Sequence, residues 1–98
     1  MAIMWDNIFN KNDNVVSRKI LDETILVPIR GKLADMQHII TLNPMAEYIW
    51  EHLDGKHKVS KILDKITDEF DVQRDEAGED MEGFLNALLK EDLIVDVV

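Results

Sequence analysis

The alternation of apolar and polar positions predicts three short strands in the first half of the chain. Segments rich in apolar and β-branched residues are typical of strands, and charged turns separate them here. They occupy residues 15–20, 24–29 and 38–42. Because these segments follow one another closely along the chain, we expect an antiparallel sheet in which sequence neighbours pair.

The third predicted strand carries apolar residues on both of its faces. Because side chains alternate between faces, Ile40 and Leu42 share one face, and Ile39 and Thr41 share the other. Leu42 leads directly into a predicted helix, so we assign Ile40 and Leu42 to the core. Ile39 and Thr41 then remain free for a partner.

A period near 3.6 predicts three helices in the second half of the chain. They cover residues 44–53, about 59–70 and about 75–91, and a closing strand or extended tail follows at residues 93–98. Asn43 is a favourable N-cap for the first helix, and Pro44 fits its first position. We expect Gly55 to lie just past the end of this helix in a left-handed conformation.

Two apolar rows on the third predicted helix compete for the core. We assign Phe84 and Leu88 to the core. Met81, Leu85 and Leu89 form a second row at i, i+4 and i+8. This second row either also belongs to the core or forms one wall of a binding groove.

Residues 1–14 differ from the rest of the chain, because asparagine and aspartate alternate with scattered apolar residues. We expect a flexible N-terminal extension followed by a single domain over residues 15–98. The alternative is a docking segment that covers an apolar groove on its own molecule or on a neighbour. A mobile segment and a free sheet edge are compatible with a monomer or a strand-exchanged dimer.

Composition indicates a small cytoplasmic domain. The chain has 98 residues, 46% of them hydrophobic, which is too apolar for a disordered protein. It contains no cysteine, which excludes disulfides, thiol catalysis and cysteine-based zinc sites, and fits a reducing compartment. No apolar run is long enough for a membrane span, and the N-terminus lacks a signal-peptide pattern.

The predicted architecture is an α+β, winged-helix-like fold with a three-stranded antiparallel sheet followed by three helices. Such folds often bind DNA through the third helix. Here residues 74–92 contain 7 acidic and 2 basic residues, and the chain has a net charge of −9. This charge disfavours nucleic acid as a partner and a regulator as the function.

The residue types needed for catalysis do not form a recognisable constellation. His38, His52 and His57 show no metal-ligand spacing, and the four glycines form no phosphate-binding loop. We therefore expect no enzymatic activity, no cofactor and no metal site.

An exposed sheet edge is the remaining feature that suits a function. The unpaired backbone groups of the third strand accept a peptide as an additional strand, and neighbouring side chains provide selectivity. The predicted peptide-binding residues come from this strand, its preceding residue and the third helix. They are Gln37, Ile39, Thr41, Met81, Leu85 and Leu89.

The chain also resembles the PqqD-like family, named for a coenzyme PQQ synthesis protein. The resemblance extends over residues 16–97 and rests on Leu42-Asn43, Ala46, Ile49-Trp50, Leu53-Asp54-Gly55, Val59, Ile62, Leu63, Phe70-Asp71-Val72, Phe84-Leu85, Leu88 and Leu93-Ile94. It implies a peptide chaperone that binds the leader of a ribosomally made precursor peptide and presents it to a modifying enzyme, commonly a radical SAM protein.

Two features depart from the family pattern. Pro44 replaces an acidic residue that is frequent after the asparagine, and the N-terminal segment with Trp5 and Phe9 lies outside the pattern. The second departure leaves open whether the chain serves PQQ synthesis or another peptide. The alternative function is that of an acidic adaptor, which docks a biosynthetic enzyme without binding a leader peptide.

Overall fold

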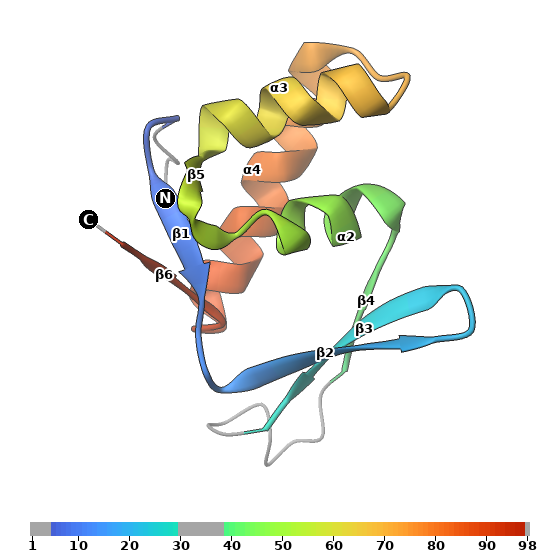
Figure 1. Ribbon diagram of the computed structural model, residues 1–98, viewed down its shortest axis with the longest axis vertical. Helices are drawn as coiled ribbons and strands as arrows, with labels where there is room; N and C mark the ends of the chain where they lie inside the picture. The colour runs from blue at the N-terminus through green and yellow to red at the C-terminus, as the bar shows by residue number, and fades with distance from the viewer. Residues whose placement is uncertain (1–4, 30–38, 98) are drawn as a thin grey trace.

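The computed structural model describes residues 5–29 and 39–97. Its elements form two three-stranded antiparallel sheets and three helices (Figure 1). In chain order they are β1 (Ile8–Lys11), β2 (Val15–Ile20), β3 (Glu23–Pro28), β4 (Ile40–Leu42), α2 (Pro44–Glu51), β5 (Asp54–Lys58), α3 (Val59–Glu69), α4 (Arg74–Lys90) and β6 (Ile94–Asp96).

The predicted meander is confirmed in the sheet with strand order β2-β3-β4. β2 and β3 pair from Val15 opposite Pro28 to Ile20 opposite Glu23, so only Leu21 and Asp22 connect them. β4 pairs with β3 on one side, with Ile40 opposite Leu26. The fold is therefore α+β as expected, with this sheet followed by three helices.

The sequence analysis did not predict the second sheet, with strand order β5-β1-β6. β1 lies in its centre and pairs antiparallel with β5 and with β6. Residues 8–11, which we expected in a flexible extension, therefore form an integral strand, and Phe9 is only 3% exposed. The winged-helix comparison is only loose, because this sheet has no counterpart in the predicted arrangement.

The end of α2 also differs from the sequence prediction. The helix stops at Glu51, and the ring Nδ1 of His52 lies 2.8 Å from the carbonyl oxygen of Tyr48. Gly55 has the expected positive φ of 78°, but it belongs to β5 and does not cap α2. The chain turns earlier because residues 54–58 pair with β1.

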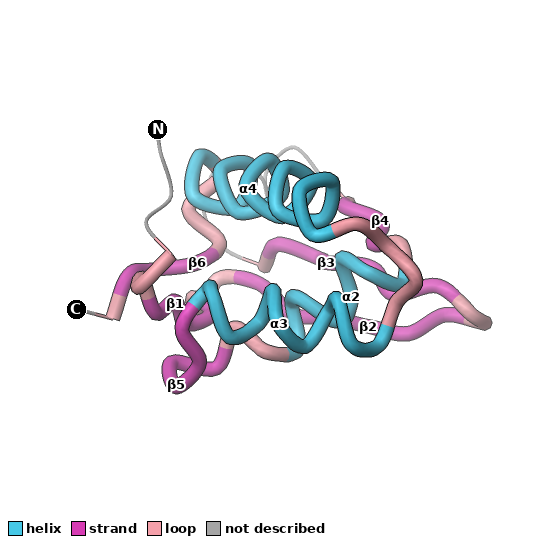
Figure 2. Tube along the Cα trace, turned by 90° about the horizontal axis from the view of Figure 1, so that it is seen from above, coloured by secondary structure: helices cyan, strands magenta, loops and turns pink. Residues whose placement is uncertain are grey.

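The core lies between the β2-β3-β4 sheet and the helices. Figure 1 shows the helices on one side of this sheet, and Figure 2 shows β4 beside one end of α4. Leu26 from β3, Trp50 from α2 and Ile66 from α3 are buried there. Trp50 is thus part of the scaffold.

Candidate functional site

β4 is an edge strand that has no charged residue to protect it. Among the described residues, β3 pairs with one of its sides and no strand pairs with the other. The segment 39–42 contains only isoleucine, threonine and leucine. Natural edge strands are usually blocked by charge, proline or a covering element, so an apolar open edge is a typical site for adding another strand.

A cavity of about 380 Å³ lies against this edge, between β4, α2 and α4. Its lining consists of apolar side chains together with Thr41, Asn43 and one charged residue, Asp80. The lining residues are Ile40, Thr41, Leu42, Asn43, Met45, Ala46, Ile49, Asp80 and Phe84. We call this cavity the β4 groove. A backbone edge beside an apolar groove can hold both the main chain and a side chain of an extended peptide.

Short polar contacts hold the β4 groove in shape. The Asn43 side chain accepts a hydrogen bond of 2.8 Å from the backbone N–H of Ala46, which fixes the start of α2. The buried Thr24 hydroxyl donates a hydrogen bond of 2.5 Å to Glu47, and Lys19 lies 3.4 Å from the same carboxylate. The Thr24 hydrogen bond lowers the pKa of Glu47 and ties β3 to α2.

The strand residues predicted for the site lie on the outer face of the sheet. Ile39 is 56% exposed and Thr41 is exposed, whereas Leu42 is buried and Ile40 packs against the core. The predicted alternation along β4 is therefore confirmed. Thr41 also lines the β4 groove. Gln37 lies outside the described residues.

On α4, Leu88 is buried as expected, and the second row follows the alternative in which it also belongs to the core. Met81 and Leu85 are completely buried, and Leu89 is partly buried against the core without lining the β4 groove. Phe84, which we assigned to the core, packs against it only in part and also lines the groove. The buried face of α4 also includes the small residues Ala77 and Gly78, and Gly78 lies close to Leu63 and Trp5. The apolar pattern of the helix alone does not distinguish this face from the other row.

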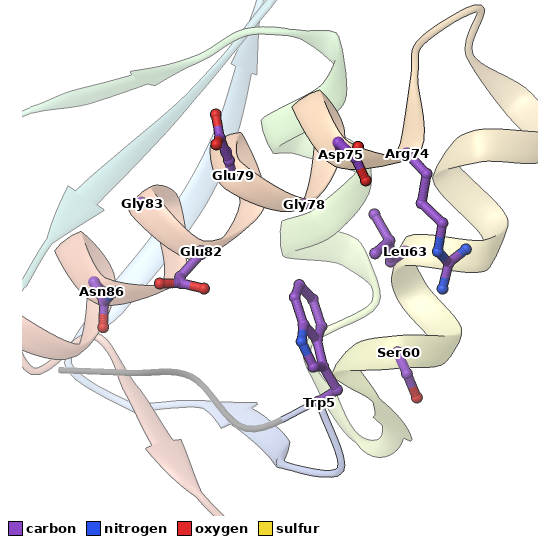
Figure 3. A pocket seen from close by; sticks show the side chains of 10 residues that line it. All are labelled: Trp5, Ser60, Leu63, Arg74, Asp75, Gly78, Glu79, Glu82, Gly83 and Asn86. Carbon is purple, nitrogen blue, oxygen red and sulfur yellow. The ribbon is translucent and has the colours of Figure 1, made fainter.

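A larger cavity, of about 820 Å³, lies on the opposite flank of α4 (Figure 3). Trp5 packs near Gly78 and Leu63 there, and the carboxylates of Asp75, Glu79 and Glu82 belong to its lining. Because the Trp5 carbonyl accepts a hydrogen bond of 2.9 Å from the Ser60 N–H, this part of the N-terminal segment is held away from the β4 groove. No open strand edge contributes to the cavity, so it is the less suitable peptide site.

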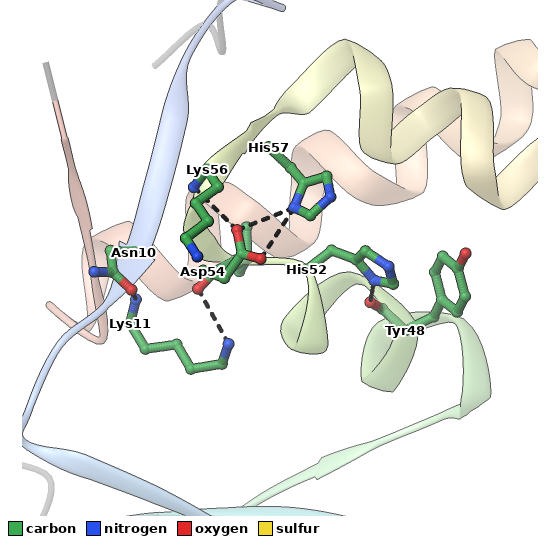
Figure 4. Close-up of polar contacts among 8 residues, drawn as sticks. Asn10, Lys11, Tyr48, His52, Asp54, Lys56 and His57 are labelled. Carbon is green, nitrogen blue, oxygen red and sulfur yellow. Dashed lines mark hydrogen bonds and ion pairs between the residues drawn. The ribbon is translucent and has the colours of Figure 1, made fainter.

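His52 and His57 have structural partners, and His38 lies outside the described residues. Nδ1 of His57 lies 3.0 Å from one carboxylate oxygen of Asp54, and the Lys56 N–H donates to the same carboxylate (Figure 4). The hydrogen bond to His57 is the main reason that the pKa of Asp54 falls to about 2. Within residues 5–29 and 39–97, no group of three or more His, Cys, Asp or Glu residues is arranged to hold a metal ion.

The helices of the described segments are too short or too polar to cross a bilayer.

Two solved structures are similar to this one. TbiB1 in complex with the TbiA(beta) leader peptide has a TM-score of 0.70 and 28% sequence identity, and the match covers 87% of this chain and 93% of that chain. Lasso peptide synthetase B1 complexed with the leader peptide has a TM-score of 0.74 at 18% identity, covering 90% and 98% of the two chains. The second likeness establishes the fold alone.

No curated protein sequence matches the chain. The model of one family does match, over residues 23–94, and that family is coenzyme PQQ synthesis protein D. The match runs from β3 into β6 and includes the open β4 edge and all three helices. The chain belongs to the PqqD family.

Proposed function

We propose that this protein recognises the leader of a ribosomally made precursor peptide and holds it for a modifying enzyme. The observation that carries the proposal is the open apolar edge of β4 beside the β4 groove. The 28% identical relative TbiB1 was solved with a leader peptide, which supports the same class of ligand here. The protein itself contributes recognition, and the reaction belongs to its partner.

The binding step in this proposal is strand addition. The leader pairs with the backbone of β4 and extends the sheet, and every second side chain points toward α2 and α4. One apolar side chain that enters the β4 groove contributes about 1.5–3 kcal/mol, and each backbone hydrogen bond adds about 1 kcal/mol net. Ordering of the leader costs about 2–5 kcal/mol, so the expected affinity is in the micromolar range, which permits release.

The proposal extends to the partner and the compartment. The family resemblance favours a radical SAM protein as the modifying enzyme. A cytoplasmic location fits both the lack of cysteine and synthesis of the precursor on ribosomes.

The test uses peptides selected from a displayed library of random 20-residue segments, with the purified protein as bait. Phe84→Asp places a charge in the wall of the β4 groove, and we expect it to weaken binding of the selected peptides at least tenfold. Val95→Asp is the matched control, because Val95 is 41% exposed on β6, which belongs to the other sheet, and it does not line the β4 groove. Affinity is measured by calorimetry and the fold by circular dichroism.

Phe84 is preferred over Leu85 for this test, because Leu85 is completely buried and a charge there would unfold the domain. Amide chemical shifts of the complex provide a second measurement, with the largest changes expected at residues 39–42. The proposal fails if no peptide is selected, or if Phe84→Asp and Val95→Asp bind the selected peptides equally well.

A further inference from the structure

Asp80 is the one charged residue among the nine that line the β4 groove. It is exposed, and it forms no hydrogen bond or ion pair with any other described residue. Some carboxylates are engaged by neighbours, as Glu47 is by Thr24 and Asp54 by His57, and Asp64 lies 2.7 Å from Arg74. Within the described part of the chain, Asp80 shares its lack of a partner with other carboxylates of α4, but it is the one that lines the β4 groove. The charge of Asp80 is therefore available to a ligand.

The position of Asp80 on α4 places this charge next to an aromatic ring. Asp80 and Phe84 are four residues apart, so their side chains are neighbours on one flank of the helix. A carboxylate and an aromatic face side by side attract the same kind of group, because both favour positive charge. Such a pair suits the end of a lysine or arginine side chain whose aliphatic stem lies on apolar surface.

The charges around Asp80 support this preference. Glu76 lies one turn earlier on the same helix and adds negative charge. No lysine or arginine among the described residues belongs to the groove lining. Lys19, on the β2-β3 hairpin, is engaged with Glu47. The residues 59–98 have a net charge of −8, which attracts basic peptides from a distance.

We infer that the leader bound by this protein carries a lysine or arginine two residues from the apolar side chain that fills the β4 groove. This inference rests on the proposed function. Residues i and i+2 of an extended strand point to the same face, so an anchor in the groove places the next side chain on that face along the strand near Asp80 and Phe84. An acidic residue at the same position is repelled.

The experiment repeats the library selection with three proteins. The wild type should enrich lysine and arginine at a fixed spacing of two from an apolar residue. Asp80→Lys should instead enrich aspartate and glutamate there. The control Glu69→Lys has the same change of charge on exposed surface of α3, and should keep the wild-type preference. A selected peptide with its lysine changed to glutamate should bind the wild type about three- to tenfold more weakly, and Asp80→Lys more tightly.

The outcomes separate this inference from the proposed function. If peptides are selected and Phe84→Asp abolishes their binding, but Asp80→Lys leaves the residue preference unchanged, the inference is overturned and the proposed function stands. If Glu69→Lys changes the preference as much as Asp80→Lys does, the effect is general attraction to an acidic protein and the inference is also overturned. If no peptide depends on Phe84, the proposed function fails first.

Discussion

The edge strands β5 and β4, one from each sheet, differ in the residues that they expose to a possible additional strand. In the β5-β1-β6 sheet, the edge strand β5 carries Lys56 and Lys58, and Asp54 at its start is hydrogen-bonded to His57. In the β2-β3-β4 sheet, the edge strand β4 is short, apolar and next to a cavity. Charged edges discourage additional strands, and apolar edges accept them. This difference between the two edge strands is what the proposed strand addition at β4 relies on.

The largest expected difference between the sheets concerns stability. Phe9 in β1 is almost fully buried, so Phe9→Ala should lower the free energy of unfolding by about 3–5 kcal/mol. Ile39→Ala removes an exposed side chain beside β4 and should change the free energy of unfolding by no more than about 0.5 kcal/mol. Urea unfolding followed by circular dichroism measures both values. Equal losses in the two variants would remove the distinction between an integral strand and an open edge.

A smaller effect is expected from the glycine in β5. Gly55 has a φ of 78°, and a Cβ added to it would lie 3.1 Å from Nδ2 of Asn10 in β1. Gly55→Ala should therefore lower the free energy of unfolding by about 1–2 kcal/mol. Gly83→Ala, at an exposed position of α4, is the matched control, since a Cβ added to Gly83 meets no atom within 4 Å. This substitution should raise the free energy of unfolding by about 0.5–1 kcal/mol. Opposite signs in urea unfolding are the diagnostic result.

The smallest effect depends on pH and belongs to the β5-β1-β6 sheet. Because the pKa of Asp54 is lowered to about 2 in the folded state, its contribution is present above the unfolded value near 3.8 and is lost as the pH falls through 2. The Asp54 side chain is 36% exposed, so solvent limits the contribution to no more than about 1 kcal/mol.

Asp54→Asn isolates this contribution from the protonation of other carboxylates. The difference in unfolding free energy between wild type and variant should shrink between pH 5 and pH 2. NMR titration of His57→Ala should show the pKa of Asp54 rising toward 3.8. A carboxyl that still titrates near 2 in that variant would exclude the His57 hydrogen bond as the cause.

The first sheet could be predicted from the sequence and the second could not, because the strands of the first are favoured by their own residues and those of the second by pairing with distant segments. β2 and β3 are rich in β-branched residues and are joined by a two-residue connection, so the local pattern identified both. β5 contains a glycine, two lysines and a histidine, and it is a strand because β1 pairs with it. Pairing between segments far apart in the sequence leaves no local pattern, which is why the second sheet was missed.

Only part of the candidate site could be predicted, again because local pattern does not reveal tertiary contacts. The open edge of the third strand followed from strand order and alternation alone. The wall formed by α4 could not be predicted in this way. Met81, Phe84 and Leu85 are all apolar, so the helical period allows more than one rotation of α4 about its axis. The rotation is decided by the close approach of Gly78 to Leu63 and Trp5, which is a tertiary contact.

The central position of β1 has a consequence for the order in which the chain matures during synthesis. Phe9 and Lys11 pair with Asp96 and Ile94, so β1 cannot complete this pairing until residues 94–96 have left the ribosome. The β2-β3 hairpin and β4 are complete long before that moment. The apolar edge is therefore exposed on a nascent chain whose other sheet has not yet closed, and this interval is when it is most vulnerable to pairing with the wrong strand.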